Sequence, residues 1–278
     1  MLKVSELYIY PIKSLGGIFL NEAKLTDRGF QYDRCWMLVD KNNCFLTQRE
    51  LPGMALLQVQ LATEGLQVHH KKQPGEILFI PFQSQSTEKL IVKVFDDICH
   101  AQAVSAEADK WFSNMLSFDC RLVFMPETTH RKVDSRYAGN EEITSFTDGY
   151  PLLMIGQSSL DDLNGRLEES LPINRFRPNI VFTGGLPYEE DTMEHFTINE
   201  INFFGVKLSA RCMITTTNQA DASRGKEPLK TLATYRTRDK NVYFGQNLLF
   251  KGEGEIRLND VIEIITKKRS LLDEEDSL

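Results

Sequence analysis

One cysteine lies in a stretch whose neighbours could change its chemistry. Cys212 follows an alternating apolar segment and Arg211, and a run of threonines begins at Thr215, ahead of a polar loop. A nearby cation favours the thiolate, the form that binds soft metals and attacks electrophiles. Neighbouring residues of a strand point to opposite faces, so Arg211 need not touch the sulfur. A free cysteine is also commonly buried as a small apolar residue, so ligand, nucleophile and core residue all remain open for Cys212.

Three further segments are rich in groups that could hold an anion. Lys13 and Ser14 precede a glycine pair whose backbone amides can approach an anion closely. Arg34 directly precedes an apolar strand and offers a planar fork for a phosphate. The segment NRFRPN at 174–179 carries two arginines, and its proline is expected to hold the preceding residue, Arg177, in extended geometry. Each segment could equally be a surface turn or loop whose cations are solvated or paired with carboxylates.

The composition of the 278-residue chain argues against several classes of protein. An apolar share of 41% suffices for a sizeable core, whereas a net charge of −7 disfavours non-specific binding to nucleic acid. No apolar run is long enough for a membrane-spanning helix, and the first residues lack the apolar core of a signal peptide. The five cysteines are odd in number and irregularly spaced, unlike a disulfide framework. We therefore expect a cytoplasmic protein that binds neither nucleic acid nor a membrane.

Common catalytic signatures are missing from the sequence. There is no Cys-x-x-Cys pair, so a zinc or iron–sulfur site made of cysteines alone is disfavoured. There is no His-x-x-x-His spacing, so a zinc hydrolase has little support. The Gly-x-Ser-x-Gly elbow of many serine hydrolases does not occur either. A Ser-His-Asp triad without that elbow stays open.

Periodicity predicts the elements that must position these residues. Short apolar or alternating runs separated by Gly, Pro and Asn are typical of a barrel or a strongly bent sheet. Ser105 is expected to cap a helix over residues 105–116, and Ser158 with Asp161 has the spacing of a capping box for a second helix. The polar segment 126–150 is expected to be a functional or mobile loop. Strands are expected over residues 7–10, 35–39, 44–46, 57–61, 90–95, 120–125, 151–155, 179–182, 196–204, 206–215, 242–244, 248–250 and 261–265, and a short helix over 229–235.

Taken together, these segments resemble the MOSC family of molybdenum cofactor proteins, above all its amidoxime-reducing and YcbX-like members. The resemblance covers about residues 1–266 and keeps the motifs in family order. Its motifs are YPIKSLGG (10–17) and DRCWMLV (33–39) for an N-terminal β-barrel domain, and RFRPNIV (175–181), RCMITTT (211–217), KEPLKTL (226–232) and FGQN (244–247) for the MOSC domain.

The resemblance implies a β-rich α+β fold with a few short helices. An N-terminal β-barrel-like domain over residues 1–120 would pack on a MOSC β-barrel domain over residues 121–266. Residues 267–278, which are charged and Ser-rich, are expected to form a disordered tail.

The resemblance also implies a bound molybdenum cofactor, a pterin dithiolene with a phosphate. Cys212 would be the protein ligand of the molybdenum and the catalytic residue. Lys13, Ser14 and Arg34 would contact the pterin and the phosphate. Further positions that match the lining of the cofactor site are Thr147, Asp148, Arg177, Asn179 and Arg211.

The implied activity is the two-electron reduction of N-hydroxylated compounds such as amidoximes, hydroxylamines and N-hydroxylated bases. Other roles stay open within the family. Cys212 could accept a persulfide in a sulfur-carrier protein, or the chain could bind the cofactor without catalysis. A β-rich interaction protein that binds no pterin is a further alternative.

The chain departs from the family pattern in two places. Asn218 stands where the mitochondrial members carry an aspartate, which is expected to change hydrogen bonding in that loop. The sequence also lacks the Cys-x4-Cys-x2-Cys of the ferredoxin-like domain found in many YcbX-like members. We therefore expect electrons to come from a separate partner, a reductase or a ferredoxin-like protein.

Overall fold

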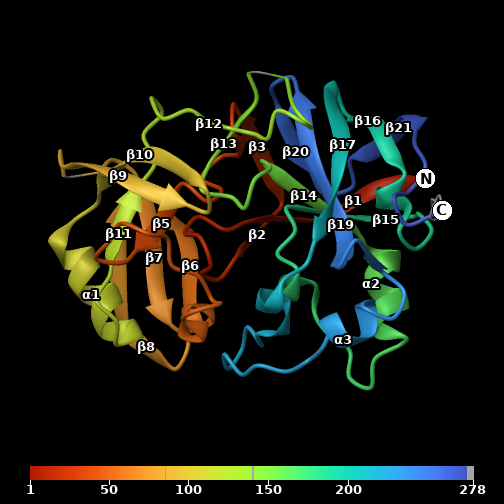
Figure 1. Cartoon of the computed structure of the whole chain (residues 1–278). Coiled ribbons are helices and arrows are strands. Elements are labelled where there is room, and N and C mark those ends of the chain that lie inside the picture. Colours follow the sequence, from red (N-terminus) through yellow and green to blue (C-terminus); the bar gives the residue numbers. More distant parts are fainter. Residues whose placement is uncertain (85, 140, 274–278) are drawn as a thin grey trace.

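The computed structural model describes residues 1–84, 86–139 and 141–273, and a closed seven-stranded barrel forms one side of the molecule (Figure 1). The strands follow one another around the ring in the order β14, β15, β1, β21, β16, β17 and β19, and pairing of β14 with β19 closes it. Closure leaves none of these strands with an unpaired edge. Their bounds are β1 (Leu2–Ile9), β14 (Leu152–Gly156), β15 (Ile180–Thr183), β16 (Met193–Ile198), β17 (Ile201–Ala210), β19 (Asn241–Lys251) and β21 (Val261–Lys267).

A second lobe packs beside the barrel and forms a half-barrel (Figure 1). One four-stranded antiparallel sheet runs in the order β5 (Trp36–Val39), β11 (Arg121–Phe124), β10 (Asp97–Ala103) and β9 (Lys89–Val94). A three-stranded sheet contains β6 (Leu57–Ala62), β7 (Gly65–His70) and β8 (Gln73–Pro81). Helix α1 (Ala106–Leu116) buries its apolar side against this lobe. The lobe thus has a core separate from that of the barrel.

Shorter elements connect and cover these two bodies. Helix α2 (Gln157–Asn164) and helix α3 (Leu229–Leu232) lie against the barrel. The short strands are β2 (Ile18–Leu20), β3 (Glu22–Thr26), β4 (Gly29–Phe30), β12 (Arg131–Lys132), β13 (Ile143–Thr144), β18 (Thr237–Arg238) and β20 (Glu255–Arg257). The β-rich class with few short helices is confirmed.

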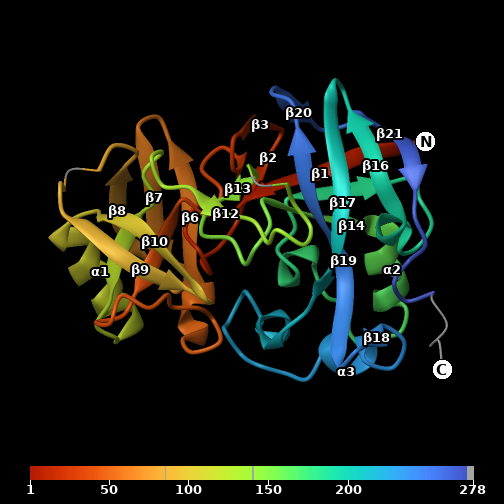
Figure 2. The same cartoon turned by 45° about the horizontal axis from the view of Figure 1, so that its top comes forward.

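The first strands of the chain belong in space to the barrel. β1 pairs with β15 and β21, β2 pairs with β1, and β3 pairs with β20. In Figures 1 and 2, β1 in red runs among the green and blue strands. The domain boundaries expected at residues 120 and 266 stay predictions. Along the chain, the strands of the second lobe all lie between β4 and β14.

Local signals predicted some elements and misled at others. Ser105 caps α1 as expected, its hydroxyl accepting from the Ala108 amide. The capping box at Ser158 was wrong, because the N-cap of α2 is Gly156, two residues earlier, and no side-chain cap bond occurs there among the described residues. The strand expected over 206–215 ends at Ala210, and a 3₁₀ turn (Met213–Thr216) follows Cys212.

The chain after the last barrel strand returns to the barrel wall. The Lys268 amide donates to the Thr192 carbonyl at 2.8 Å, and the buried Ser270 hydroxyl donates to Asp191 at 3.3 Å. These residues belong to the segment expected as a disordered tail, of which positions 274–278 lie outside the described residues.

A buried carboxyl lies next to this contact. Glu190 is 0% exposed; one of its oxygens accepts from Ser159 at 2.8 Å, and the other has no partner among the described residues. Burial, with the Asp191 charge beside it, raises the pKa of Glu190 to about 7. The ionised form of Glu190 therefore destabilises the folded state.

We predict that Glu190→Gln stabilises the protein at alkaline pH. Because the folded pKa lies above the usual 4.5, the contribution of Glu190 to the stability of the wild type is fully present below pH 4.5 and is lost as pH rises through about 7. The gain at pH 8.5 is expected to be at most about 3 kcal/mol, and it should shrink toward pH 5. Urea unfolding at both pH values measures it, with the exposed Glu194→Gln as control. Equal midpoints for wild type and Glu190→Gln at pH 8.5 would contradict the prediction.

Candidate functional site

A cavity of about 260 Å³ opens where the barrel meets the second lobe. Residues from distant parts of the chain line it, and they include every position that the sequence singled out. These are Lys13, Ser14, Arg34, Thr147, Asp148, Arg177, Asn179, Arg211 and Cys212. The structure thus brings the whole predicted set together around one space.

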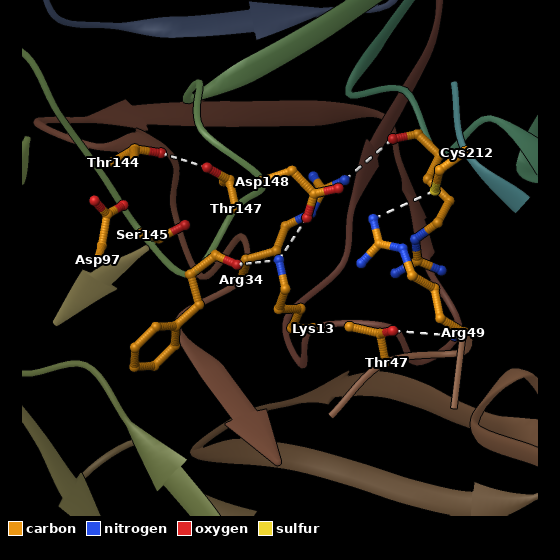
Figure 3. Close-up of polar contacts among 12 residues, drawn as sticks. Lys13, Arg34, Thr47, Arg49, Asp97, Thr144, Ser145, Thr147, Asp148 and Cys212 are labelled. Atoms are coloured by element: carbon orange, nitrogen blue, oxygen red, sulfur yellow. Dashed lines mark hydrogen bonds and ion pairs between the residues drawn. The ribbon is translucent and has the colours of Figure 1, made fainter. Parts of the chain in front are cut away.

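Lys13 forms one wall of the cavity. Its amide donates to the Trp36 carbonyl at 2.8 Å, which fixes the turn after β1 against β5. Its ammonium group donates to the Phe146 carbonyl at 2.8 Å and to Asp148 at 2.5 Å (Figure 3). Burial, opposed by the Asp148 charge, lowers the pKa of Lys13 to about 8. Lys13 therefore loses its proton far more easily than a surface lysine.

Asp148 pairs with Lys13 and keeps 68% of its side chain exposed in the cavity wall. Desolvation raises its pKa, but the Lys13 ammonium outweighs this, so the pKa of Asp148 lies well below its usual range. Thr147 points away from Asp148 and shares a hydrogen bond of 2.7 Å with the Thr144 hydroxyl (Figure 3). The carboxylate of Asp148 is therefore an acceptor available to a ligand.

Two arginines lie over the same aromatic ring. The guanidinium carbons of Arg34 and Arg177 are 4.3 and 4.2 Å from the ring centroid of Tyr10. Contact with the π face offsets part of the cost of holding these cations in a buried place. Burial lowers the pKa of Arg177 to about 10. Arg34 is also fixed by Asp33 at 2.6 Å.

The extended geometry expected for Arg177 was wrong. Its φ is 57°, in the left-handed region, as is that of Arg34 at 50°. This turn directs the Arg177 carbonyl to the Arg34 guanidinium, which donates to it at 3.1 Å. Tertiary contacts between the two arginine segments thus override the local preference before proline.

The side chain of Asn179 forms hydrogen bonds with three other residues of the protein. Its carbonyl oxygen accepts from Arg34 at 3.1 Å and from the Leu153 amide at 3.2 Å, and its amide donates to the Tyr8 carbonyl at 3.1 Å. The residue is buried. Asn179 therefore joins β1, β14 and β15 and orients Arg34 toward the cavity.

Arg211 directs its hydrogen bonds to oxygen atoms of the protein. Its guanidinium donates to the Ser209 hydroxyl at 2.7 Å and to the Phe176 carbonyl at 2.5 Å. Burial lowers the pKa of Arg211 to about 10. The cation on Cys212 is instead Arg49, whose Nη2 donates to Sγ at 3.3 Å (Figure 3).

Arg49 is the residue that the sequence did not reveal. It lies between Thr47 and Glu50, two residues with the spacing of a capping box. The Thr47 hydroxyl does donate to the Glu50 carboxylate at 2.6 Å. That signal indicates an ordered turn at most. Nothing in it points to a cysteine in the other half of the chain.

The residues that line the cavity include more cationic than anionic side chains. Several guanidinium nitrogens at its wall are buried and have no hydrogen-bond partner within the described part of the chain. They are Arg175 Nε, Arg177 Nη2 and Arg211 Nε. Buried donors are normally satisfied, so these groups fit an anionic or acceptor-rich ligand.

Residues 1–84, 86–139 and 141–273 were also searched for metal-binding clusters, membrane-spanning helices and disulfides. No group of three or more His, Cys, Asp and Glu side chains there is placed to hold a metal ion. No helix within these ranges is long and apolar enough to span a membrane. All five cysteines are free.

Both halves of the chain match family models. The MOSC N-terminal beta barrel domain matches residues 1–119, and the MOSC domain matches residues 141–263. The chain therefore belongs to the family of MOSC-domain proteins, as its motifs predicted.

Within this family the chain is similar to amidoxime-reducing components. It is 29% identical to mitochondrial amidoxime-reducing component 1 of Mus musculus over 281 residues, covering 94% of this chain and 82% of that protein. It is 31% identical to mitochondrial amidoxime reducing component 2 of Bos taurus over 286 residues, covering 93% and 82%. It is also 28% identical to a molybdenum cofactor sulfurase of Oryza sativa subsp. japonica over 277 residues, covering 91% of this chain but 33% of that protein.

We predict that the cavity binds sulfate more weakly as pH rises through about 8. Lys13 loses its charge there because burial has lowered its pKa to about 8, whereas the charge of sulfate stays constant. The affinity should fall at least about tenfold between pH 7 and pH 9.5. Calorimetric titration at equal ionic strength in chloride buffers measures the change.

In this experiment Lys13→Met should bind weakly at both pH values and lose the step between them. Lys24→Met, an exposed lysine on β3, should behave as the wild type. A wild-type affinity that is the same at pH 7 and pH 9.5 would contradict the assignment of Lys13 to anion binding.

Proposed function

We propose that this protein is a molybdenum-cofactor-dependent reductase of N-hydroxylated compounds. One observation carries the proposal: a single cavity joins the sulfur of Cys212 to arginines with buried nitrogen atoms that have no hydrogen-bond partner among the described residues. A thiolate is a suitable ligand for molybdenum, and arginine and lysine suit the phosphate of its pterin. The names of the mouse and bovine relatives support the same reaction class.

The residues present fit the cofactor in chemical type. Cys212 would be the protein ligand of the metal. Lys13, Arg34, Arg177 and Arg211 would hold the phosphate and the acceptor atoms of the pterin, and Ser14, Thr147 and Asp148 would bond its remaining polar groups. Asn179 would act through Arg34, because its own hydrogen bonds go to the protein.

When bound, the cofactor supplies two-electron chemistry, with molybdenum cycling between its IV and VI states. Reduction of an N-hydroxylated compound consumes two electrons and two protons and releases water. The protein anchors and orients the group through Cys212 and the cations of the cavity wall. Electrons would come from a separate donor protein, a reductase or a ferredoxin-like protein, and the substrate would be a small molecule.

The compartment is proposed only in general terms. Free cysteines suit a reducing environment. The cytoplasmic location expected from the sequence gains no support from the mouse and bovine relatives, whose names place them in mitochondria. We therefore propose a reducing compartment and do not specify which one.

The rice relative favours a second candidate function. Its name is that of a molybdenum cofactor sulfurase, and its alignment with this chain covers 91% of the chain. In such a role Cys212 would accept a persulfide sulfur. Mass spectrometry separates the two functions, because a persulfide on Cys212 in protein free of molybdenum would favour the sulfur carrier.

We predict that wild type purified from a host that makes the cofactor contains molybdenum and reduces benzamidoxime with an artificial electron donor. Cys212→Ala should lose metal and activity, each by on the order of 100-fold, because the protein ligand is gone. Cys44→Ala, a half-buried cysteine outside the cavity lining, should keep both. Metal analysis and donor oxidation measure the result.

Full metal loading without turnover of any N-hydroxylated compound would reject the reaction and leave a cofactor-binding module. Retention of metal in Cys212→Ala would reject the anchoring role of the cysteine. Absence of molybdenum from wild type would reject the proposed function altogether.

A further inference from the structure

The contact between Arg49 and Cys212 crosses from one lobe to the other. Arg49 lies in the second lobe, between β5 and a 3₁₀ turn (Pro52–Leu56), whereas Cys212 follows barrel strand β17. The Nη2–Sγ distance is 3.3 Å. Among the described residues, those that line the cavity do not include Arg49. Its guanidinium therefore reaches the site through the sulfur of Cys212.

Arg49 is held on several sides. Its amide donates to the Thr47 hydroxyl at 3.0 Å, and its carbonyl accepts from Arg224 at 2.6 Å. Its guanidinium carbon is 5.4 Å from the ring centroid of Phe95. The donor to the sulfur is thus oriented before any ligand binds.

Gln48, next to Arg49, connects this loop by hydrogen bonds to Ser14 and to Gln219. Gln48 and Gln219 exchange amide hydrogen bonds of 3.0 and 2.9 Å, and both side chains are buried. Gln48 also donates to the Ser14 carbonyl at 2.7 Å. One loop therefore links the Lys13–Ser14 turn to the segment that carries Cys212.

An N–H donor on a metal-binding sulfur has two physical effects. It fixes the direction of the sulfur lone pairs, and it reduces the electron density that the sulfur gives to the metal. A guanidinium is well suited to this role because its planar donors are rigid and permanently charged. Lysine offers charge without that geometry.

We propose that Arg49 is a positioning residue for Cys212, which holds its sulfur in the orientation that binds molybdenum and tunes the metal–sulfur bond. The inference rests on the proposed function, because it assumes that Cys212 binds the metal. It adds that the second lobe contributes directly to the metal centre through the Thr47–Glu50 turn.

The experiment compares Arg49→Gln and Arg49→Lys with wild type, all expressed with the cofactor. Molybdenum per chain is measured after extended dialysis, and the EPR spectrum of the remaining metal is recorded after partial reduction to Mo(V), because the IV and VI states give no signal. Arg49→Gln should retain about 10- to 100-fold less metal than wild type, with an altered spectrum. Arg49→Lys should recover part of the retention but not the wild-type spectrum.

A matched control is Arg136→Gln, which removes an arginine whose side chain is 76% exposed and bonds Asp134. It should match wild type in both measurements. Thermal unfolding of each metal-free variant shows whether the fold is kept.

Wild-type retention and spectrum in Arg49→Gln would overturn the inference and leave the proposed function standing. An unchanged spectrum would overturn it even if retention fell, because a loss of stability alone does not change the metal–sulfur bond. Wild type without molybdenum would instead reject the proposed function, and the inference with it.

Discussion

Positive charge confined at the junction of two lobes is the constraint on which the site depends. Lys13, Arg177 and Arg211 all have pKa values lowered by burial, which means that the fold holds their charges at a cost. Contact with Tyr10 and the Asp148 carboxylate offsets only part of it. An anionic ligand would relieve the rest, so its binding and the stability of the junction are linked.

The barrel and the second lobe contribute different residues to this junction. The barrel carries Cys212 and the Arg175–Asn179 segment, and the turn that follows β1 supplies Lys13. The second lobe supplies one ordered turn, whose Gln48 and Arg49 reach across to Gln219 and Cys212. Asn179 shows how closely structure and chemistry are joined, because its hydrogen bonds fix both the barrel strands and the arginine that faces the cavity.

The residues of the cavity could be grouped from the sequence because their motifs resemble those of the MOSC family, whereas their chemistry alone left each segment open. Ser105 likewise revealed the start of α1 through a local hydrogen bond. Features set by long-range contacts were not predictable. The left-handed backbone of Arg177 depends on Arg34, and the role of Arg49 depends on a residue in the other lobe. The buried Glu190 looks in sequence like an ordinary solvated acid.

The pairing of β1 with β21 has a consequence for how the chain reaches its native state. Leu2 and Lys3 lie opposite Ile262 and Val261, so the ring joins the two ends of the described chain. During synthesis β1 can pair with β2 and β15, but its pairing with β21 cannot form until the last barrel strand leaves the ribosome. Such non-local pairing slows folding and lengthens exposure to aggregation. The strands of the half-barrel lobe all precede β14 along the chain, so this lobe is complete much earlier in translation and is free to fold first.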